Sequence, residues 1–167
     1  SSELQIKMSE LTEKVISAFR VHFKYEPSYT ILSPGRINII GEHVDYNDGF
    51  VLPAAIDKYV CFAIAESGTS QCTLVALDLN KSYTFDLNTE LVPVADMWAN
   101  YILGVVAPLK NQLKGFNITF SSTIPMGSGL SSSAAVECGA AFAFNTLFDL
   151  GLSKQQLAKL GQQAEHS

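Results

Sequence analysis

The sequence is poor in cysteine, and its three cysteines match no metal-binding or redox motif. Cys61, Cys72 and Cys138 are 11 and 66 residues apart, and each has apolar neighbours. An odd number of cysteines also argues against a framework of disulfide bonds. We therefore expect three reduced, buried thiols, as in a cytoplasmic protein.

The chain also has little charge and no long apolar run. Charged residues make up 16% of its 167 residues, the net charge is -5, and no run of Lys or Arg occurs. We therefore expect no nucleic-acid partner and no binding to an anionic membrane surface. No segment reaches the roughly 18 uninterrupted apolar residues of a membrane span, and the N-terminal residues lack the apolar core of a signal peptide. The apolar content of 47% instead predicts a globular domain with a core.

The spacing of apolar residues predicts an α+β fold, in which several strands lie between a first helix and the later helices. Helices are predicted at residues 4–23, 95–113, 130–147 and 153–165. Strands are predicted at residues 28–33, 58–66, 72–78, 82–87 and 116–122. Pro108 predicts a kink or break in the second helix. The alternation of apolar and polar residues in 116–122 predicts a half-buried strand, and residues 36–53, rich in Asn, Asp and Gly, predict a functional loop.

A segment rich in glycine and serine joins the last predicted strand to the next helix. It reads Ile-Pro-Met-Gly-Ser-Gly-Leu-Ser-Ser-Ser over residues 124–133. Glycines allow close backbone approach, the unpaired N–H groups of a helix N-terminus suit a phosphate chain, and serine hydroxyls can coordinate Mg²⁺. Two known phosphate-binding motifs are absent, because the chain has no Gly-Lys pair and Ser132 occupies the third glycine position of the dinucleotide fingerprint. Simple capping of the helix by serine is the alternative explanation.

The predicted loop at residues 36–53 concentrates polar side chains. Within 13 residues it contains Arg36, Glu42, His43, Asp45 and Asp48. Ionised carboxylates accept several hydrogen bonds each, so they hold sugar hydroxyls well. Acidic loops also bind Ca²⁺, but this loop does not fit the EF-hand pattern because His43 and Val44 interrupt it. This density of polar groups between apolar strands favours a binding site over a solvated loop.

Residues 125–134 resemble the P-x-x-x-G-L-S-S-S-A motif of the GHMP kinase superfamily, which contains galactokinase, homoserine kinase, mevalonate kinase and phosphomevalonate kinase. The resemblance implies the N-terminal domain of that superfamily, a mixed sheet with helices packed on one side. It also implies ATP as co-substrate and Mg²⁺ as cofactor, with Ser132 as one metal ligand. By resemblance, the phosphates of ATP bind at Gly127, Ser128, Gly129, Leu130, Ser131, Ser132 and Ser133.

Residues 35–55 resemble the signature G-R-x-N-x-I-G-E-H-x-D-Y-x-x-G-x-x-L-P-x-A, which distinguishes galactokinases within the superfamily. By resemblance, the hydroxyls of galactose bind to Glu42, His43 and Asp45. Arg36 is implied near the reacting hydroxyl, where it can hold the catalytic aspartate ionised and offset charge on the phosphoryl group.

A third stretch, residues 98–104, resembles the W-x-N-Y-x-x-G stretch of galactokinases. The resemblance implies that Trp98 and Tyr101 lie in the nucleotide region. Without the family, core positions in an amphipathic helix explain both residues.

The resemblance covers essentially the whole chain but implies a longer protein. Glu165 lies in a segment that resembles the one carrying the second Mg²⁺ ligand of galactokinases, and in that family the catalytic aspartate follows shortly afterwards in a C-G-x-M-D-Q motif. We therefore expect residues 1–167 to be a truncated N-terminal sugar- and ATP-binding domain without its C-terminal domain. The full-length protein is expected to phosphorylate the C1 hydroxyl of galactose, the first committed step of galactose catabolism, and this chain alone to be inactive.

Three alternatives stay open. A related sugar kinase would act on N-acetylgalactosamine, arabinose or galacturonate, although Asn47-Asp48-Gly49 fits the plain galactose pattern. A transcriptional sensor of galactose and ATP would lack part of the serine-alanine end of the phosphate motif, which residues 131–134 retain. A plain structural α+β module leaves the polar loop unexplained. The sequence predicts no oligomeric state.

Overall fold

The computed structural model describes residues 2–34, 59–123 and 130–166, with side chains described in these ranges except at 130–132 and 162–166. Its helices are α1 (Ser2–Phe23), α3 (Met97–Leu109), α4 (Leu130–Phe148) and α5 (Lys154–His166), with short 3-10 turns η1 (Leu77–Leu79) and η2 (Lys110–Gln112). Its strands are β1 (Tyr29–Pro34), β2 (Tyr59–Glu66), β3 (Gln71–Ala76), β4 (Lys81–Asp86) and β5 (Phe116–Ser122). The predicted helices and strands are therefore confirmed, and the ends differ by no more than four residues.

The larger boundary shifts have local causes. Pro108 lies in the last turn of α3, and the helix ends one residue later and tightens into η2. The strand predicted to reach residue 78 ends at Ala76, because η1 follows and Asn80 adopts the left-handed conformation with φ of 52°. Asparagine tolerates that conformation better than most residues, and it starts the hairpin return into β4.

The five described strands form one mixed sheet in the order β1-β2-β5-β3-β4. β3 and β5 run parallel, and every other neighbouring pair is antiparallel. This confirms the mixed sheet of the expected α+β class. β5 lies at the centre of the sheet, although it is the last strand along the described chain.

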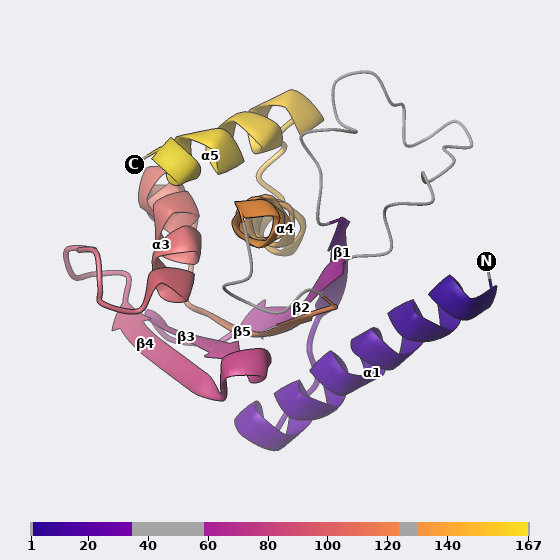
Figure 1. Ribbon diagram of the computed structural model, residues 1–167. Coiled ribbons are helices and arrows are strands. Elements are labelled where there is room, and N and C mark those ends of the chain that lie inside the picture. Colours follow the sequence, from indigo (N-terminus) through magenta and orange to yellow (C-terminus); the bar gives the residue numbers. More distant parts are fainter. Residues whose placement is uncertain (1, 35–58, 124–129, 167) are drawn as a thin grey trace.

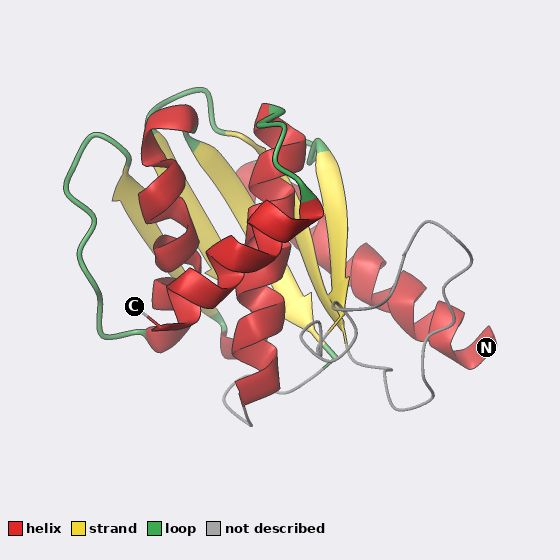
Figure 2. Ribbon diagram, turned by 90° about the horizontal axis from the view of Figure 1, so that it is seen from above, coloured by secondary structure: helices red, strands yellow, loops and turns green. Residues whose placement is uncertain are grey.

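Helices cover both faces of this sheet, which corrects the expectation that they pack on one side. Figure 1 shows α3 and α4 above the sheet, α5 outside them, and α1 alone below. The view from above in Figure 2 shows the helices of the upper layer lying over the strands. On the lower face, Leu11, Val15 and Phe19 of α1 form a separate buried cluster with Tyr59, Cys61, Ala63 and Ala65 of β2.

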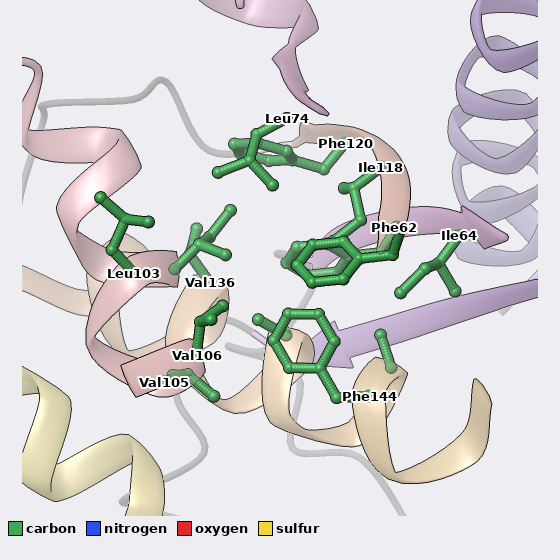
Figure 3. Packing of buried hydrophobic residues seen from close by; sticks show 14 of the residues in the cluster. Phe62, Ile64, Leu74, Leu103, Val105, Val106, Ile118, Phe120, Val136 and Phe144 are labelled. Atoms are coloured by element: carbon green, nitrogen blue, oxygen red, sulfur yellow. The ribbon is translucent and has the colours of Figure 1, made fainter. Parts of the chain in front are cut away.

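The main core fills the space between the sheet and the helices α3 and α4, as Figure 3 shows. Phe62 of β2 stacks on Phe120 of β5 with ring centroids 5.4 Å apart, and Phe144 of α4 packs against Phe116 at 4.7 Å. α4 can lie this close because small residues, among them five alanines and Gly139, occupy many of its positions. A Cβ atom added to Gly139 would be 2.3 Å from Cε1 of Phe62, so only glycine fits there.

β5 is buried on both faces rather than half-buried, because α1 covers the face that carries its polar residues. Each of those residues has a specific partner. Asn117 donates to the hydroxyl of Tyr25 at 3.2 Å, and Thr119 donates to the carbonyl of Val15 at 2.9 Å. The hydroxyl of Ser121 donates to a carboxylate at 2.6 Å, discussed below. The polar alternation therefore reflects hydrogen bonds to covering elements and not exposure to solvent.

Candidate functional site

The described residues that flank the two motif-bearing segments lie at one edge of the sheet. Residues 35–58 lie between Pro34 and Tyr59, which are paired partners in β1 and β2. Residues 124–129 follow Thr123, whose backbone N–H donates to the carbonyl of Tyr59 at 2.9 Å. The backbone N–H of Tyr59 in turn donates to Oγ1 of Thr123 at 2.7 Å. Three of the four chain positions that flank the two segments are therefore neighbours: Pro34 pairs with Tyr59 in the sheet, and Tyr59 bonds Thr123 directly.

The fourth flanking position is the start of α4 at Leu130. The hydroxyl of Ser33, buried at the end of β1, donates to the carbonyl of Ala135 at 3.0 Å. This bond fixes the beginning of α4 against the strand that leads into residues 35–58. The first backbone N–H groups of a helix lack partners within the helix and carry its positive dipole end, so this corner of the fold suits an anion.

Most of the predicted site residues lie outside what the structure describes. Residues 35–58 include the sugar candidates Arg36, Glu42, His43 and Asp45. Residues 124–129 include the phosphate candidates Gly127, Ser128 and Gly129. The backbones of Leu130, Ser131, Ser132 and Glu165 belong to α4 and α5, but their side chains are outside the described set. Ser133 is buried in the first turn of α4. These roles therefore stay predictions.

Trp98 and Tyr101 are described, and both pack against the main core. Trp98 is 4% exposed in the first turn of α3, with its ring centroid 6.0 Å from that of Phe120. Its core role is thus confirmed. Within the described part of the chain, the indole Nε1 is buried without a hydrogen-bond partner. A buried donor of this kind is uncommon, and Phe120 lies two residues before the end of β5, on the side of residues 124–129.

Asn100 has a structural role that the sequence did not reveal. Its Oδ1 accepts from the backbone N–H of Val94 at 2.8 Å, and its Nδ2 donates to the carbonyl of Val94 at 2.8 Å. The amide therefore holds the segment that leads into α3, next to Trp98. Asn100 is the asparagine of the W-x-N-Y stretch quoted above, and its position between the two aromatic residues was the available signal.

The three cysteines are buried and form no disulfide bond, which confirms the prediction. Burial raises the pKa of the Cys72 thiol to about 12 and that of Cys61 to about 11, so both stay protonated near neutral pH. Among the described residues, no group of three or more His, Cys, Asp or Glu side chains could hold a metal ion. None of the helices in residues 2–34, 59–123 and 130–166 is long and apolar enough to cross a membrane.

Two family models match separate parts of the chain. The galactokinase galactose-binding signature matches residues 17–66, and the GHMP kinase N-terminal domain matches residues 100–167. The first match contains β1, β2 and the predicted sugar loop, and the second contains β5, α4 and the predicted phosphate segment. The two resemblances stated above are therefore supported independently.

Curated relatives and solved structures agree with these matches. The chain is 40% identical over 152 residues to galactokinases of Glaesserella parasuis serovar 5 and Actinobacillus pleuropneumoniae serotype 3, covering 89% of this chain and 40% of each relative. The crystal structure of Lactococcus lactis galactokinase complexed with galactose superposes with a TM-score of 0.68 at 30% identity, over 95% of this chain and 42% of that one. A mevalonate kinase structure shares the fold, with a TM-score of 0.58 at 24% identity.

The chain thus spans about two fifths of the length of the curated relatives it matches. Its signature match, its domain match and its similarity to curated galactokinases all point to one branch of one superfamily. The chain is therefore similar to galactokinases of the GHMP kinase superfamily over most of its own length and over about two fifths of theirs.

Proposed function

We propose that the full-length protein transfers the γ-phosphoryl group of ATP to the C1 hydroxyl of galactose, forming galactose 1-phosphate. The observation that carries the proposal is the direct bonding between Tyr59 and Thr123. These residues border the galactose-signature segment and the phosphate segment, respectively. Phosphoryl transfer depends on holding acceptor and donor close and in line, and this sheet edge is where the two segments start.

The predicted residues divide into sugar, phosphate and metal roles. Glu42, His43 and Asp45 would bind sugar hydroxyls, and Arg36 would stabilise charge at the reacting centre. The phosphates of ATP would lie against Gly127, Ser128 and Gly129 and against the N-terminal turn of α4. That turn starts at Leu130 and includes Ser131, Ser132 and Ser133. Trp98, with its buried indole N–H, and Tyr101 would border the nucleotide.

Mg²⁺ is the metal that suits the predicted ligands. The hydroxyl of Ser132 and the carboxylate of Glu165 are hard oxygen donors, which Mg²⁺ prefers, and a metal at ATP normally keeps several water ligands. Two protein ligands are therefore enough. When bound, Mg²⁺ would neutralise charge on the phosphates.

We also propose that residues 1–167 form the N-terminal sugar- and ATP-binding domain and that the catalytic aspartate belongs to a part of the protein after Glu165. A cytoplasmic location is proposed as well, supported by three buried cysteines that form no disulfide bond. Nucleic acid is not expected as a partner, in keeping with the net charge of -5.

The direct test uses the purified full-length protein with Mg·ATP and separate sugars. We expect ADP release that depends on galactose, and a product with phosphate on the anomeric oxygen by phosphorus NMR. Preference for N-acetylgalactosamine or arabinose would support a related sugar kinase instead. Binding of galactose and ATP without turnover would support a sensor.

A matched pair of variants tests the sugar loop. Asp45→Asn removes a predicted sugar ligand and should lower kcat/KM for galactose by about tenfold or more, as loss of a charged hydrogen bond does. Asp48→Asn changes the same kind of side chain three residues away, where the resemblance assigns no role, and should leave kcat/KM close to wild type. Equal effects of the two variants would contradict the assignment of Asp45.

A further inference from the structure

Asp78 lies in η1, just after β3, and its carboxylate accepts three hydrogen bonds. Oδ1 accepts from the hydroxyl of Ser121 at 2.6 Å and from Nζ of Lys14 at 3.2 Å. Oδ2 accepts from the backbone N–H of Ser122 at 2.8 Å. One carboxylate therefore joins α1, η1 and the end of β5, and two of its three bonds go to β5.

The two bonds to β5 compensate for the early end of the neighbouring strand. β3 stops at Ala76, which pairs with Phe120, so Ser121 and Ser122 extend beyond β3. The hydroxyl of Ser121 is on a residue only 1% exposed, and it needs an acceptor there. Asp78 supplies that acceptor and also bonds the next backbone N–H. Charged acceptors form stronger hydrogen bonds than neutral ones, so the last two residues of β5 are held firmly.

The bond to Lys14 is the least important of the three. The side chain of Lys14 is 55% exposed and that of Asp78 is 20% exposed. Ion pairs with an exposed partner are screened by water and salt and contribute little. Removing Lys14 therefore leaves the bonds to Ser121 and Ser122 in place, which provides a matched control.

The end of β5 determines where the chain leaves the sheet toward the phosphate segment. Thr123 follows Ser122 directly. The six residues 124–129 then separate Thr123 from Leu130, where α4 begins. The positions of its two ends set the distance that such a connection has to bridge. The start of α4 is fixed through Ser33 and Ala135, and the end of β5 is fixed through Asp78.

We propose that Asp78 is a positioning residue for nucleotide binding: by holding Ser121 and Ser122, it sets the point from which the phosphate segment leaves β5. The inference rests on the proposed function only in naming the ligand as Mg·ATP. The carboxylate bonds the strand end next to the phosphate segment directly, whereas Tyr59, next to the sugar segment, is reached only through Thr123. We therefore expect a larger effect on the nucleotide than on the sugar.

The test compares three variants of the full-length protein. Asp78→Asn keeps the size of the side chain but removes its charge, so the bonds to Ser121 and Ser122 become weaker neutral ones. Ser121→Ala removes the hydroxyl bond to Asp78 and keeps the bond from the backbone N–H of Ser122 to Asp78. Lys14→Met removes only the exposed ion pair. Each protein is titrated by calorimetry with Mg²⁺ and a non-hydrolysable ATP analogue without sugar, and KM for ATP, KM for galactose and kcat are measured well below the thermal transition.

We expect Asp78→Asn and Ser121→Ala to weaken analogue binding and raise KM for ATP about two- to thirtyfold, with a clearly smaller change in KM for galactose. Lys14→Met should match wild type. The proposal is overturned if both variants bind the analogue like wild type, or if KM rises equally for both substrates, as general loosening would cause. If Asp78→Asn does not fold, the milder Ser121→Ala decides.

A wild-type protein that binds the analogue but does not phosphorylate galactose would contradict the proposed function alone, because the calorimetric comparison does not involve the sugar.

Discussion

At the scale of single residues, two asparagine side chains each bond both the N–H and the carbonyl of one other residue, and these bonds contribute to stability. Asn100 bonds the N–H and the carbonyl of Val94, and Asn145 does the same for Leu152. A primary amide has both a donor and an acceptor, so it can satisfy both groups of a residue outside the helices and strands. Asn145 thereby fixes the connection between α4 and α5.

Replacing Asn145 by Ala should lower the free energy of unfolding by about 1–3 kcal/mol, because both bonds to Leu152 are lost in a half-buried site. Urea denaturation of purified protein measures this change. Asn111→Ala is the matched control, since Asn111 is exposed and no side-chain hydrogen bond to it is found in the described ranges. A loss at Asn145 no larger than that at Asn111 would show that the amide is not stabilising.

The raised thiol pKa values predict a loss of stability in alkali. The ordinary thiol pKa is 9.0, while burial raises it to about 12 for Cys72 and about 11 for Cys61. Above pH 9 the unfolded chain therefore loses these protons before the folded chain does, and stability falls as pH rises. Each thiol adds up to about 1.4 kcal/mol per pH unit to this fall.

Cys72→Ala should make the decline in unfolding free energy between pH 9 and 11 shallower than in wild type. The comparison of slopes removes the constant cost of the substitution itself, which is measured at pH 7. Denaturant titrations across this pH range provide both numbers. Identical slopes for the two proteins would mean that the folded thiol ionises like an unfolded one.

At the scale of elements, α4 lies against the sheet at a distance set by its small residues. An added Cβ at Gly139 would be 2.3 Å from Cε1 of Phe62 and 3.0 Å from Cβ of Ser33. Gly139→Ala gains about 1 kcal/mol of helix propensity, but the overlap outweighs it. We expect a net loss of about 1–3 kcal/mol in the free energy of unfolding.

A double-variant cycle identifies the cause of that loss. Phe62→Leu replaces the opposing ring with a smaller side chain. Gly139→Ala should therefore lower the free energy of unfolding less in that background than in wild type. Thermal or urea unfolding of the four proteins gives the coupling energy. A cost that is independent of residue 62 would place the strain elsewhere.

α1 is the element whose packing differs most from the expected arrangement. Phe19 is fully buried beneath the sheet, with its ring 4.8 Å from that of Phe23 and 5.3 Å from that of Tyr25. Phe19→Ala should cost about 3–5 kcal/mol, as cavity formation at a buried aromatic residue does. Val21→Ala, at a position 69% exposed on the same helix, should cost less than about 1 kcal/mol. Similar losses at both positions would mean that α1 does not cover the sheet in solution.

At the scale of the whole molecule, helices enclose a mixed sheet on both faces, and the two motif segments start at one of its edges. We expect a polypeptide of residues 1–167 to show no galactose-dependent ADP release, while the full-length protein does. The physical reason is that phosphoryl transfer needs a residue to take the hydroxyl proton, and the proposed aspartate follows Glu165. A coupled ADP assay on both proteins measures this, and steady turnover by residues 1–167 would refute the assignment.

Local patterns in the sequence were sufficient for the type of nearly every element. Helical spacing in residues 4–23 predicted α1, and the apolar runs predicted all five described strands. Hydrophobic periodicity reports which residues share a face, and each pattern lies within a short stretch of chain. The motifs at residues 35–55 and 125–134 likewise pointed to the two family models that match the chain, because they consist of residue types at fixed local spacing.

Only the tertiary structure decided how these elements combine. The strand order β1-β2-β5-β3-β4, the position of α1 on the second face and the burial of the polar side of β5 depend on contacts between distant parts of the chain. The bond from Ser121 to Asp78 spans 43 residues, and no local pattern marks Asp78 as different from any exposed acid. The sequence by itself therefore determined the elements and the family resemblance, while the packing of distant segments decided which polar residues serve as acceptors inside the fold.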